Sequence, residues 1–263
     1  SPNSLDALIA GIRKAKDAMG PIELWGVLVA VPGVLDARRG EVLISPNLHW
    51  TEGSRLLREI HGIFNAPVCP VQEVQALALG HLASGVSGDD FLMLDFGDGM
   101  GGAVVTQGRL LETPLPVCGE IGHTPIIGNS RKCGCGSIGC VETLVAREGL
   151  LESMRDATRN PRAKWADLEK KVREGPMPEW LVRSVDAAAT AIAGAINILG
   201  VPEVVIGGDM PTLRPDIVPM LAERVRSRSI LGRIGNVTVI AAEPQRWRGL
   251  VVAASERLLL PDR

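Results

Sequence analysis

The sequence lacks several features that would place the protein in a membrane or on nucleic acid. No continuous apolar run approaches the roughly 20 residues of a membrane-spanning helix, and residues 1–20 contain no hydrophobic signal core. No block of lysine and arginine is present, and 28 basic against 30 acidic residues give a formal net charge of −2. These absences argue against membrane insertion, and against general nucleic-acid binding by this chain itself.

The remaining composition is that of a soluble globular protein. The chain has 263 residues, 46% hydrophobic and 22% charged, enough for one large domain or two smaller ones. It contains five cysteines, an odd number, and three of them fall within "KCGCGSIGC" at residues 132–140. Clustered thiols suit a reducing compartment, where close cysteines bind metal more often than they form disulfides. We therefore expect a cytoplasmic protein.

Hydrophobic periodicity alternates along the chain between strand-like and helix-like segments. The strand-like segments are residues 22–33, a hairpin over 34–46, residues 66–71, two strands around a glycine turn in 89–112, and residues 201–210 and 237–242. The helix-like segments are residues 5–19, 52–64, 74–85, 143–174, 178–199, 213–228 and 245–259. Strands that alternate with helices indicate an α/β protein with covered sheets.

The cysteine cluster has the composition of a structural zinc site. Zinc is held by thiolates and imidazoles in a tetrahedron, and Cys133, Cys135 and Cys140 supply three such ligands. The nearest histidine in the sequence is His123, ten residues before the first of them. A loop around an ion also needs backbone conformations that side chains forbid, which suits Gly134, Gly136 and Gly139. The alternatives are reduced structural cysteines or a disulfide among them, although Cys133 and Cys135 are too close for an easy bridge.

The segments "CGEIGHTPI" and "CGCGSIGCVE" closely resemble the signature of the ROK family of repressors, open reading frames and sugar kinases. The family pattern is roughly GEIGH and then C-x-C-G-x-x-G-C-x-E, which this chain matches without a gap. The resemblance extends over most of the chain, through "VAVPGVLDARRGEVLISPNLHW", "LMLDFGDGMGGAVVTQGRLL" and "VPEVVIGGDM".

The resemblance implies the two-domain, actin-like (ribonuclease H-like) sugar-kinase fold, with a cleft between the domains. Residues 1–88 would form the remainder of an incomplete N-terminal α/β domain, because the strands of the first phosphate loop are absent. Residues 89–242 would form the C-terminal α/β domain, with the zinc knuckle at 123–142. Residues 243–263 would form a C-terminal helix that packs back on the N-terminal domain.

The resemblance also assigns a sugar site. Glu120, His123 and Glu142 match the residues that hold hexose hydroxyls, with His123 also a zinc ligand. The physical logic is that carboxylates accept paired hydrogen bonds from vicinal hydroxyls, while the ion fixes the loop that carries them. Taken alone, either glutamate would be read as a solvated surface carboxylate. The same cleft would be lined by Gly33, Asn47, Gln72 and Glu73.

The kinase machinery of the family is altered in this sequence. Glu73 stands where family kinases have the catalytic aspartate, and Gln72 where they have asparagine. The second phosphate loop, formed by Gly97, Asp98, Gly99 and Gly101, carries an acid in place of a small hydroxyl residue, and Asp209 adds another acid after the glycines at 207–208. These acids disfavour phosphate binding, although Asp98 would alternatively hold a cation or cap the turn and point away.

Two functions remain. The first is the sugar-sensing domain of a ROK transcriptional regulator without kinase activity, contacting DNA only through a segment outside this chain. The second is an ATP-dependent hexose or N-acetylhexosamine kinase, which would need ATP and Mg²⁺ and use Glu73 as its base. A purely structural zinc protein would leave the glutamate spacing unexplained. Under either reading, the chain is a fragment or its first domain is completed by a partner. We expect a structural Zn²⁺, a small-molecule sugar as ligand, and a homodimer or higher homo-oligomer.

Overall fold

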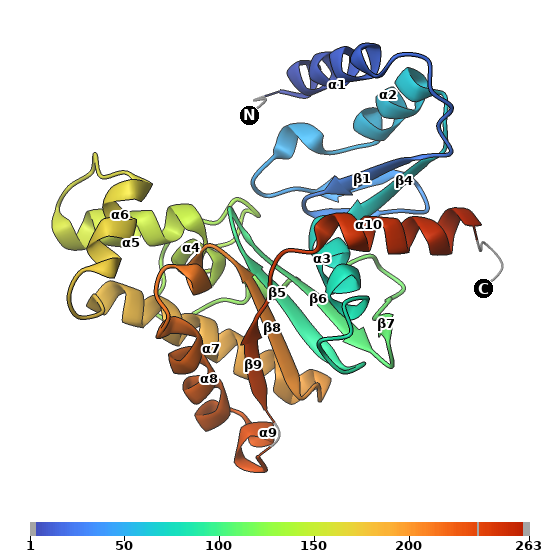
Figure 1. The fold of residues 1–263 in the computed structure, drawn as a ribbon. Coiled ribbons are helices and arrows are strands. Elements are labelled where there is room, and N and C mark those ends of the chain that lie inside the picture. The colour runs from blue at the N-terminus through green and yellow to red at the C-terminus, as the bar shows by residue number, and fades with distance from the viewer. Residues whose placement is uncertain (1–3, 236, 260–263) are drawn as a thin grey trace. The chain divides into compact units, whose positions relative to one another are not determined.

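The structure, a computed structural model, describes residues 4–235 and 237–259 and contains two compact units (Figure 1). Unit 1 comprises Ser1–Ser84, Glu112–Val117 and Gln245–Arg263. Unit 2 comprises Gly85–Leu111 and Cys118–Pro244. Each unit contains strands with helices packed against them, which confirms the predicted α/β class.

Unit 1 is built on two parallel strands, β1 (Val27–Val31) and β4 (Val68–Gln72). An antiparallel hairpin of β2 (Val34–Asp36) and β3 (Glu41–Ile44) follows β1. The helical elements are α1 (Leu5–Met19), η1 (His49–Thr51), α2 (Arg55–Phe64), α3 (Glu73–Leu82), α10 (Arg246–Ala254) and the turn η4 (Ser255–Leu259). The apolar faces of α1 and α2 bury residues such as Leu5, Ile9 and Ile60 against Val31 of β1 and its neighbours, as the helical spacing predicts.

The last helix of unit 1, α10, lies against α3 at very short range. A Cβ atom built on Gly249 of α10 would lie 1.7 Å from the carbonyl oxygen of Ala76, and one built on Gly80 of α3 would lie 2.1 Å from that of Gln245. Both glycines are therefore required for the two helix backbones to approach each other. This contact holds the start of α10 beside Gly80 of α3, from where the side chain of Arg246 reaches Glu73 at the start of α3.

Unit 2 contains a five-stranded sheet in the order β7-β6-β5-β8-β9. Its strands are β5 (Phe91–Phe96), β6 (Met100–Thr106), β7 (Arg109–Leu110), β8 (Glu203–Gly208) and β9 (Thr238–Ala241). Strands β5, β8 and β9 are parallel, while β6 returns antiparallel to β5 after a glycine turn. The helical elements are η2 (Ile121–His123), α4 (Glu142–Val145), α5 (Arg147–Thr158), α6 (Trp165–Arg173), α7 (Glu179–Leu199), η3 (Met210–Thr212), α8 (Ile217–Arg228) and α9 (Ile230–Arg233).

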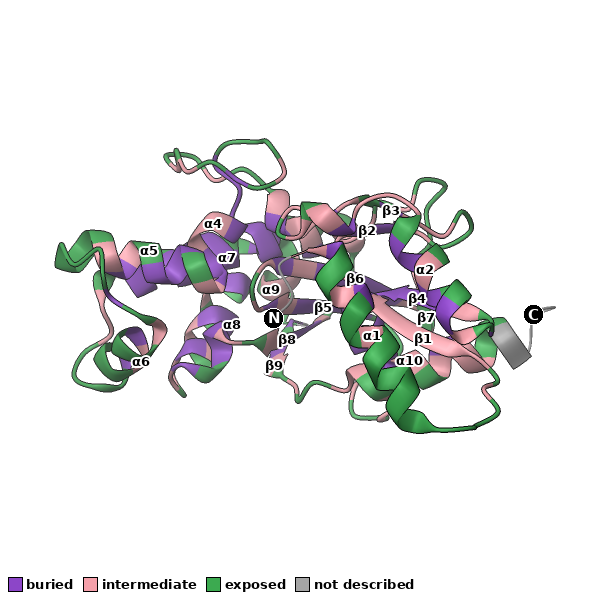
Figure 2. Ribbon diagram, turned by 90° about the horizontal axis from the view of Figure 1, so that it is seen from above, coloured by how far each residue is buried: buried purple, intermediate pink, exposed green. Residues whose placement is uncertain are grey.

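The core of unit 2 lies between its sheet and its helices. Figure 2 shows buried residues concentrated along α7 and the central strands, where Leu92, Leu94, Ile192 and Ile206 have no exposed surface. Burying a side chain of this size contributes about 1.5–3 kcal/mol each. The near-continuous apolar runs of β5 and β8 follow from burial on both faces, which is typical of central parallel strands.

Helix α7 is long and apolar enough to cross a membrane by length and composition, although Arg183 and Asp186 interrupt its apolar run. Its burial explains its composition, because 56% of its most apolar window is buried within the protein. It packs against α8, α5 and α4 inside unit 2.

The predominantly helical stretch predicted over residues 143–174 consists of α4, which begins at Glu142, followed by α5 and α6. The backbone becomes extended at Ala146, with ψ 166°, and turns left-handed at Arg159, with φ 51°. The break after α4 places Arg147 at the first position of a new helix, which matters for the site below.

Candidate functional site

In unit 1, three of the predicted site residues meet at the carboxyl ends of the parallel strands. Gly33 follows β1 by two residues, Gln72 is the last residue of β4, and Glu73 begins α3. Val31 and Gln72 are register partners, so these strand ends lie side by side. The carboxyl ends of strands are the usual ligand-binding edge of an open α/β sheet. Asn47 is exposed in the turn that follows β3.

Gly33 has a structural requirement of its own. Its φ is 79°, in the left-handed region, and a Cβ atom there would lie 2.2 Å from the carbonyl oxygen of Ile44. The β2–β3 hairpin therefore needs glycine at this position whether or not a ligand lies beside it.

Glu73, the candidate base, is paired within unit 1. Its Oε1 lies 2.6 Å from Nη2 of Arg246, the first residue of α10, and the side chains are 38% and 41% exposed. An arginine partner stabilises the charged carboxylate and occupies one of its oxygens. Glu73 therefore has one carboxylate oxygen held by a cation of its own unit.

In unit 2, His123, Cys133, Cys135 and Cys140 converge on one point, and their donor atoms all lie within 4.8 Å of one another. Sγ of Cys135 is 3.7 Å from Sγ of Cys140, and Sγ of Cys133 is 3.6 Å from Nδ1 of His123. A tetrahedral zinc ion, with Zn–S of about 2.3 Å and Zn–N of about 2.0–2.1 Å, holds two sulfurs about 3.8 Å apart and a sulfur and nitrogen about 3.6 Å apart. The four residues therefore fit a zinc ion, and all five cysteines of the chain are free thiols.

The loop that carries the cluster is held by backbone bridges and one arginine. Pro125 pairs with Cys140 and Lys132 pairs with Ile138, so the loop folds back on itself twice. Arg131 then joins the loop to α4 and α5, with Nη1 2.8 Å from the carbonyl oxygen of Thr143 and 2.9 Å from that of Gly149. These contacts position the thiols before any ion binds.

The thiols differ in their acidity. Burial raises the pKa of the Cys133 and Cys140 thiols. For Cys135 burial acts in the same direction, but hydrogen bonds with Ser137, Cys133 and Cys140 together outweigh it and leave the pKa of this thiol below its ordinary value. A metal ion binding here would therefore displace protons from Cys133 and Cys140.

Two carboxylates flank the cluster. Oε2 of Glu120 lies 3.7 Å from Nε2 of His123, the ring nitrogen that faces away from Cys133. Glu142 is only 8% exposed, with Oε1 3.5 Å from Sγ of Cys133 and Oε2 accepting a 2.8 Å hydrogen bond from the backbone N–H of Met100. Glu120, His123 and Glu142 are thus gathered at one place, and Glu142 also ties the knuckle to the start of β6.

The phosphate-loop-like turn of unit 2 contains a residue that sequence reasoning missed. Gly97, Asp98 and Gly99 form the turn after β5, and Gly101 lies in β6. The guanidinium of Arg147 binds Asp209 through two hydrogen bonds, of 2.8 and 3.0 Å, and lies 3.6 Å from Oδ1 of Asp98. The two aspartates, which the sequence predicts to disfavour phosphate binding, therefore share an arginine.

The helix boundaries in the structure give a physical reason for these two arginine–carboxylate pairs. Arg147 and Arg246 each occupy the first position of a helix, where the macrodipole disfavours a cation. An arginine at such a position is expected to have a carboxylate partner elsewhere, and in both cases it does.

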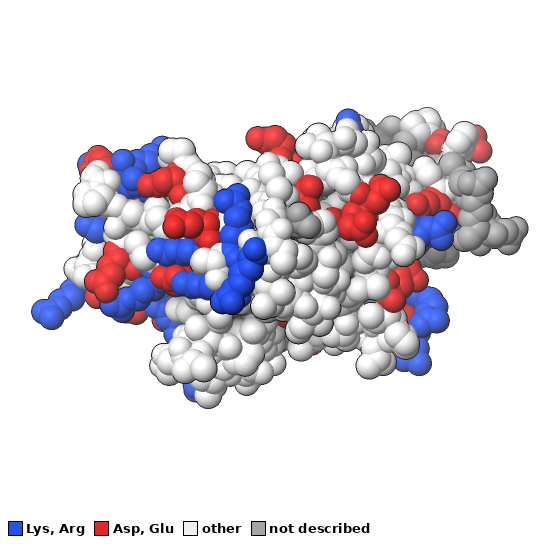
Figure 3. All heavy atoms as spheres, turned by 90° about the horizontal axis from the view of Figure 1, so that it is seen from below, with Lys and Arg blue, Asp and Glu red and all other residues white. Residues whose placement is uncertain are grey.

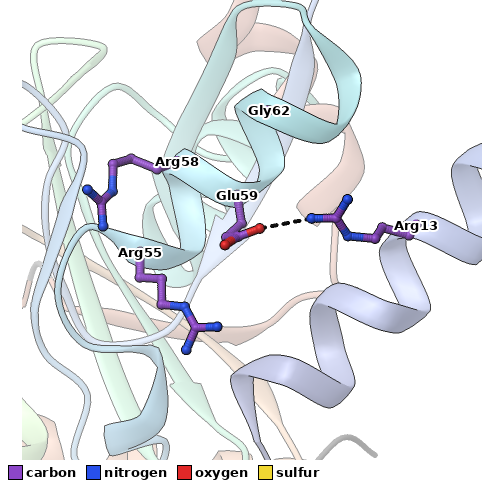
Figure 4. Close-up of a pocket in the computed structure, with 5 residues that line it drawn as sticks. All are labelled: Arg13, Arg55, Arg58, Glu59 and Gly62. Carbon is purple, nitrogen blue, oxygen red and sulfur yellow. Dashed lines mark hydrogen bonds and ion pairs between the residues drawn. The ribbon is translucent and has the colours of Figure 1, made fainter.

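A surface pocket in unit 1 lies away from these residues. It is lined by Arg13 of α1 and by Arg55, Arg58, Glu59 and Gly62 of α2 (Figure 4). Arg13 is 3.0 Å from Glu59, and Arg55 is 2.6 Å from Asp6, so the positive charge of two of the arginines is balanced locally.

Ion pairs also link the helices of unit 2. Figure 3 shows a contiguous group of basic side chains with acidic side chains beside it on the face that it views. On α7 and α8, Asp186 binds both Arg224, at 2.8 Å, and Arg228. One carboxylate here faces two arginines, so one positive charge of this group has no counter-charge in these pairs.

Comparison with known proteins extends these observations. The sequence profile described as the ROK family matches residues 2–255. The xylose repressor of Caldicellulosiruptor bescii is 25% identical over 250 residues, which cover 89% of this chain but only 62% of the repressor. The glucokinase of Thermotoga maritima is 27% identical over 244 residues, covering 86% of this chain and 77% of the kinase.

A solved structure supports the fold. The ROK family glucokinase of Streptomyces griseus, in complex with glucose and AMPPNP, has a TM-score of 0.81 at 21% identity, covering 97% of this chain and 88% of the glucokinase. This likeness confirms the predicted sugar-kinase fold.

Proposed function

The chain belongs to the ROK family, and we propose that it is the sugar-binding effector domain of a ROK transcriptional regulator, with one structural zinc ion and no kinase activity. DNA would be contacted through a segment outside this chain. The xylose repressor relative supports the regulator, and the glucokinase relative keeps an ATP-dependent hexose or N-acetylhexosamine kinase as the alternative.

The observation that carries the proposal is the gathering of Glu120, His123 and Glu142 around the cysteine cluster. Carboxylates held at fixed positions can accept hydrogen bonds from neighbouring hydroxyl groups of a sugar without first losing conformational freedom. His123, Cys133, Cys135 and Cys140 would hold zinc, which would supply rigidity to this loop. For unit 1 by itself, we propose Gly33, Asn47, Gln72 and Glu73 as sugar-binding residues.

The contacts of Glu73 support the absence of kinase activity. A general base must reach the hydroxyl group that it deprotonates, within about 2.6–3.2 Å. Glu73 instead binds Arg246 at 2.6 Å, and α10, which carries Arg246, is held in place by the close helix contact at Gly249. An enzyme that used Glu73 as its base would have to accept the proton on Oε2 or first break this pair.

A sugar panel tests the binding proposal. Glucose, xylose and N-acetylated hexosamines are added to the purified protein, and its melting temperature is measured. A ligand at a hundredfold excess over its Kd stabilises the folded state by about 2.7 kcal/mol, so a true ligand is easily seen. The affinity for the best sugar should fall about ten- to a hundredfold in Glu120→Gln and stay unchanged in Glu148→Gln, an exposed carboxylate of α5. If no sugar raises the melting temperature, the proposal is wrong.

A coupled ATP assay tests the proposed absence of kinase activity. The full-length protein, with its natural N-terminus, is incubated with the best sugar and Mg·ATP, and ADP formation is followed. We expect turnover far below about 1 per second, the lower range for kinases. Turnover at or above that rate would establish the kinase alternative.

We also propose that the protein is a cytoplasmic homodimer or higher homo-oligomer. Free thiols are typical of a reducing compartment, and the end of α1 and the loop after it expose Met19, Ile22 and Trp25 by 45%, 52% and 81%. Light scattering on the purified protein measures the assembly directly, and a monomer at micromolar concentration would contradict this part of the proposal.

A further inference from the structure

The carboxyl ends of β5 and β8 form a place where a ligand would be expected in unit 2. These strands are parallel neighbours, with Phe96 and Gly208 in register at their ends. Gly208 has a φ of 90°, and a Cβ atom there would lie 2.4 Å from the carbonyl carbon of Phe96, so the two backbones meet without side chains between them. In open α/β sheets, ligands bind at such strand ends. We call the region formed by the turns 97–99 and 207–209 the strand-end crevice.

Three carboxylates surround the strand-end crevice. Asp98 lies in the first turn and Asp209 in the second. Asp95, near the end of β5, directs its carboxylate between the turns, since its oxygens lie 3.4 and 3.7 Å from Cβ positions built on Gly97 and Gly207. The guanidinium of Arg147 pairs with Asp209 and lies 3.6 Å from Asp98, so these two acids together carry one formal negative charge more than the arginine that they share. Negative charge at this place repels the phosphates of a nucleotide.

Arg147 is held in the strand-end crevice by several independent contacts. Its two hydrogen bonds to Asp209 form a planar fork, the strongest arrangement between arginine and a carboxylate. Its guanidinium carbon lies 4.4 Å from the ring centre of Trp165, which fixes the plane of the fork. The backbone N–H of Arg147 donates to the carbonyl oxygen of Gly97 at 2.9 Å, and that of Asp209 donates to Phe96 at 2.7 Å.

We propose that Arg147 acts as an internal cation that closes the strand-end crevice, so that unit 2 rejects nucleoside triphosphates, and that neutralising Asp98 and Asp209 turns the crevice into an anion site. This inference rests on the proposed function, because it names the residues that exclude the phosphoryl donor. A triphosphate must displace two aspartates from one arginine before it gains a cation, and it still meets Asp95. Without Asp98 and Asp209, the same arginine presents its fork to phosphate oxygens.

The test is a set of calorimetric titrations with Mg·ATP and with tripolyphosphate at constant ionic strength, on the full chain. The unmodified protein should bind both more weakly than about 1 mM. The double variant Asp98→Asn/Asp209→Asn should bind at least about tenfold more tightly. Adding Arg147→Gln to the double variant should remove the gain, because the gain comes from this guanidinium. Asp98 is 89% exposed, so Asp98→Asn alone keeps the fold and should show a smaller gain in the same direction.

A matched control variant separates the gain in affinity at the crevice from the effect of a changed net charge on the whole protein. The double variant Glu179→Gln/Asp186→Asn removes two negative charges and frees arginines elsewhere in unit 2, on α7 and α8. It should leave the affinity for Mg·ATP unchanged. The proposal is overturned if the unmodified protein binds Mg·ATP with a Kd below about 100 µM, or if the double variant at the crevice gains no more than the control.

Failure of the closed-crevice proposal can be told apart from failure of the proposed sugar-binding function. The unmodified protein is titrated with the sugar panel in parallel. A protein that binds no sugar and also rejects ATP overturns the proposed function and supports the closed crevice. A protein that binds both sugar and ATP overturns the closed crevice while sugar recognition stands.

Discussion

Replacing Glu142 should weaken both the fold of unit 2 and the binding of sugar, because one buried carboxylate has two tasks. Oε2 accepts the backbone N–H of Met100 at 2.8 Å, and Oε1 faces Sγ of Cys133 at 3.5 Å. Glu142→Ala removes the acceptor and leaves the N–H of Met100 buried without a partner. Glu142→Gln keeps an oxygen for this N–H but removes the charge.

The expected losses of stability follow from the burial of the hydrogen bond between Met100 and Glu142. An unsatisfied buried N–H costs about 1–3 kcal/mol, and 1 kcal/mol lowers the melting temperature by about 2–4 °C in a protein of this size. Glu142→Ala should therefore melt about 2–12 °C lower. A hydrogen bond to a charged group exceeds a neutral one by about 1 kcal/mol, so Glu142→Gln should melt about 2–4 °C lower. We expect Glu142→Ala to lose about ten- to a hundredfold in sugar affinity.

Thermal unfolding and titration calorimetry with the best sugar of the panel measure the two effects separately. Glu148→Gln, at a side chain that is 72% exposed, serves as the control and should change neither quantity. A Glu142→Ala variant that melts within 1 °C of the unmodified protein would refute the anchoring role. A variant that melts lower but binds sugar with unchanged affinity would show that Glu142 only anchors the knuckle.

Two other predictions concern the metal and the helix contact. Metal analysis of the reduced protein should find about one zinc ion per chain, and Cys135→Ser should lose both the zinc and the sugar binding, since it removes one of the four ligands. A zinc content near zero per chain, in protein never exposed to a chelator, would contradict this prediction. Gly249→Ala should destabilise the protein by about 1–3 kcal/mol or more in denaturant unfolding, because its Cβ would lie 1.7 Å from the carbonyl oxygen of Ala76. Gly62→Ala, which meets nothing within 4 Å in α2, should be neutral or stabilising by up to about 1 kcal/mol, and equal effects of the two changes would contradict the packing argument.

The sequence by itself determined the features that depend on neighbours along the chain. Helix α1 follows from its apolar spacing, the capping Ser4 and the terminal Gly20. The cysteine loop follows from thiols separated by glycines, because a short loop can reach few arrangements and the spacing 133, 135 and 140 limits them further. The motif around these cysteines also pointed to the ROK family.

Only the tertiary structure decided the contacts between distant segments. Arg147 is 62 residues from Asp209, and Arg246 is farther still from Glu73, so neither pair leaves a pattern in a local window. The break at Ala146 was likewise invisible to periodicity, since alanine favours helix and its extended conformation is imposed by the packing around it. The sequence placed acids at the strand ends of unit 2, and the fold supplied the arginine that binds them. The physical reason is that charge pairing depends on distance in space, which the chain sets only after its helices have packed on the sheet.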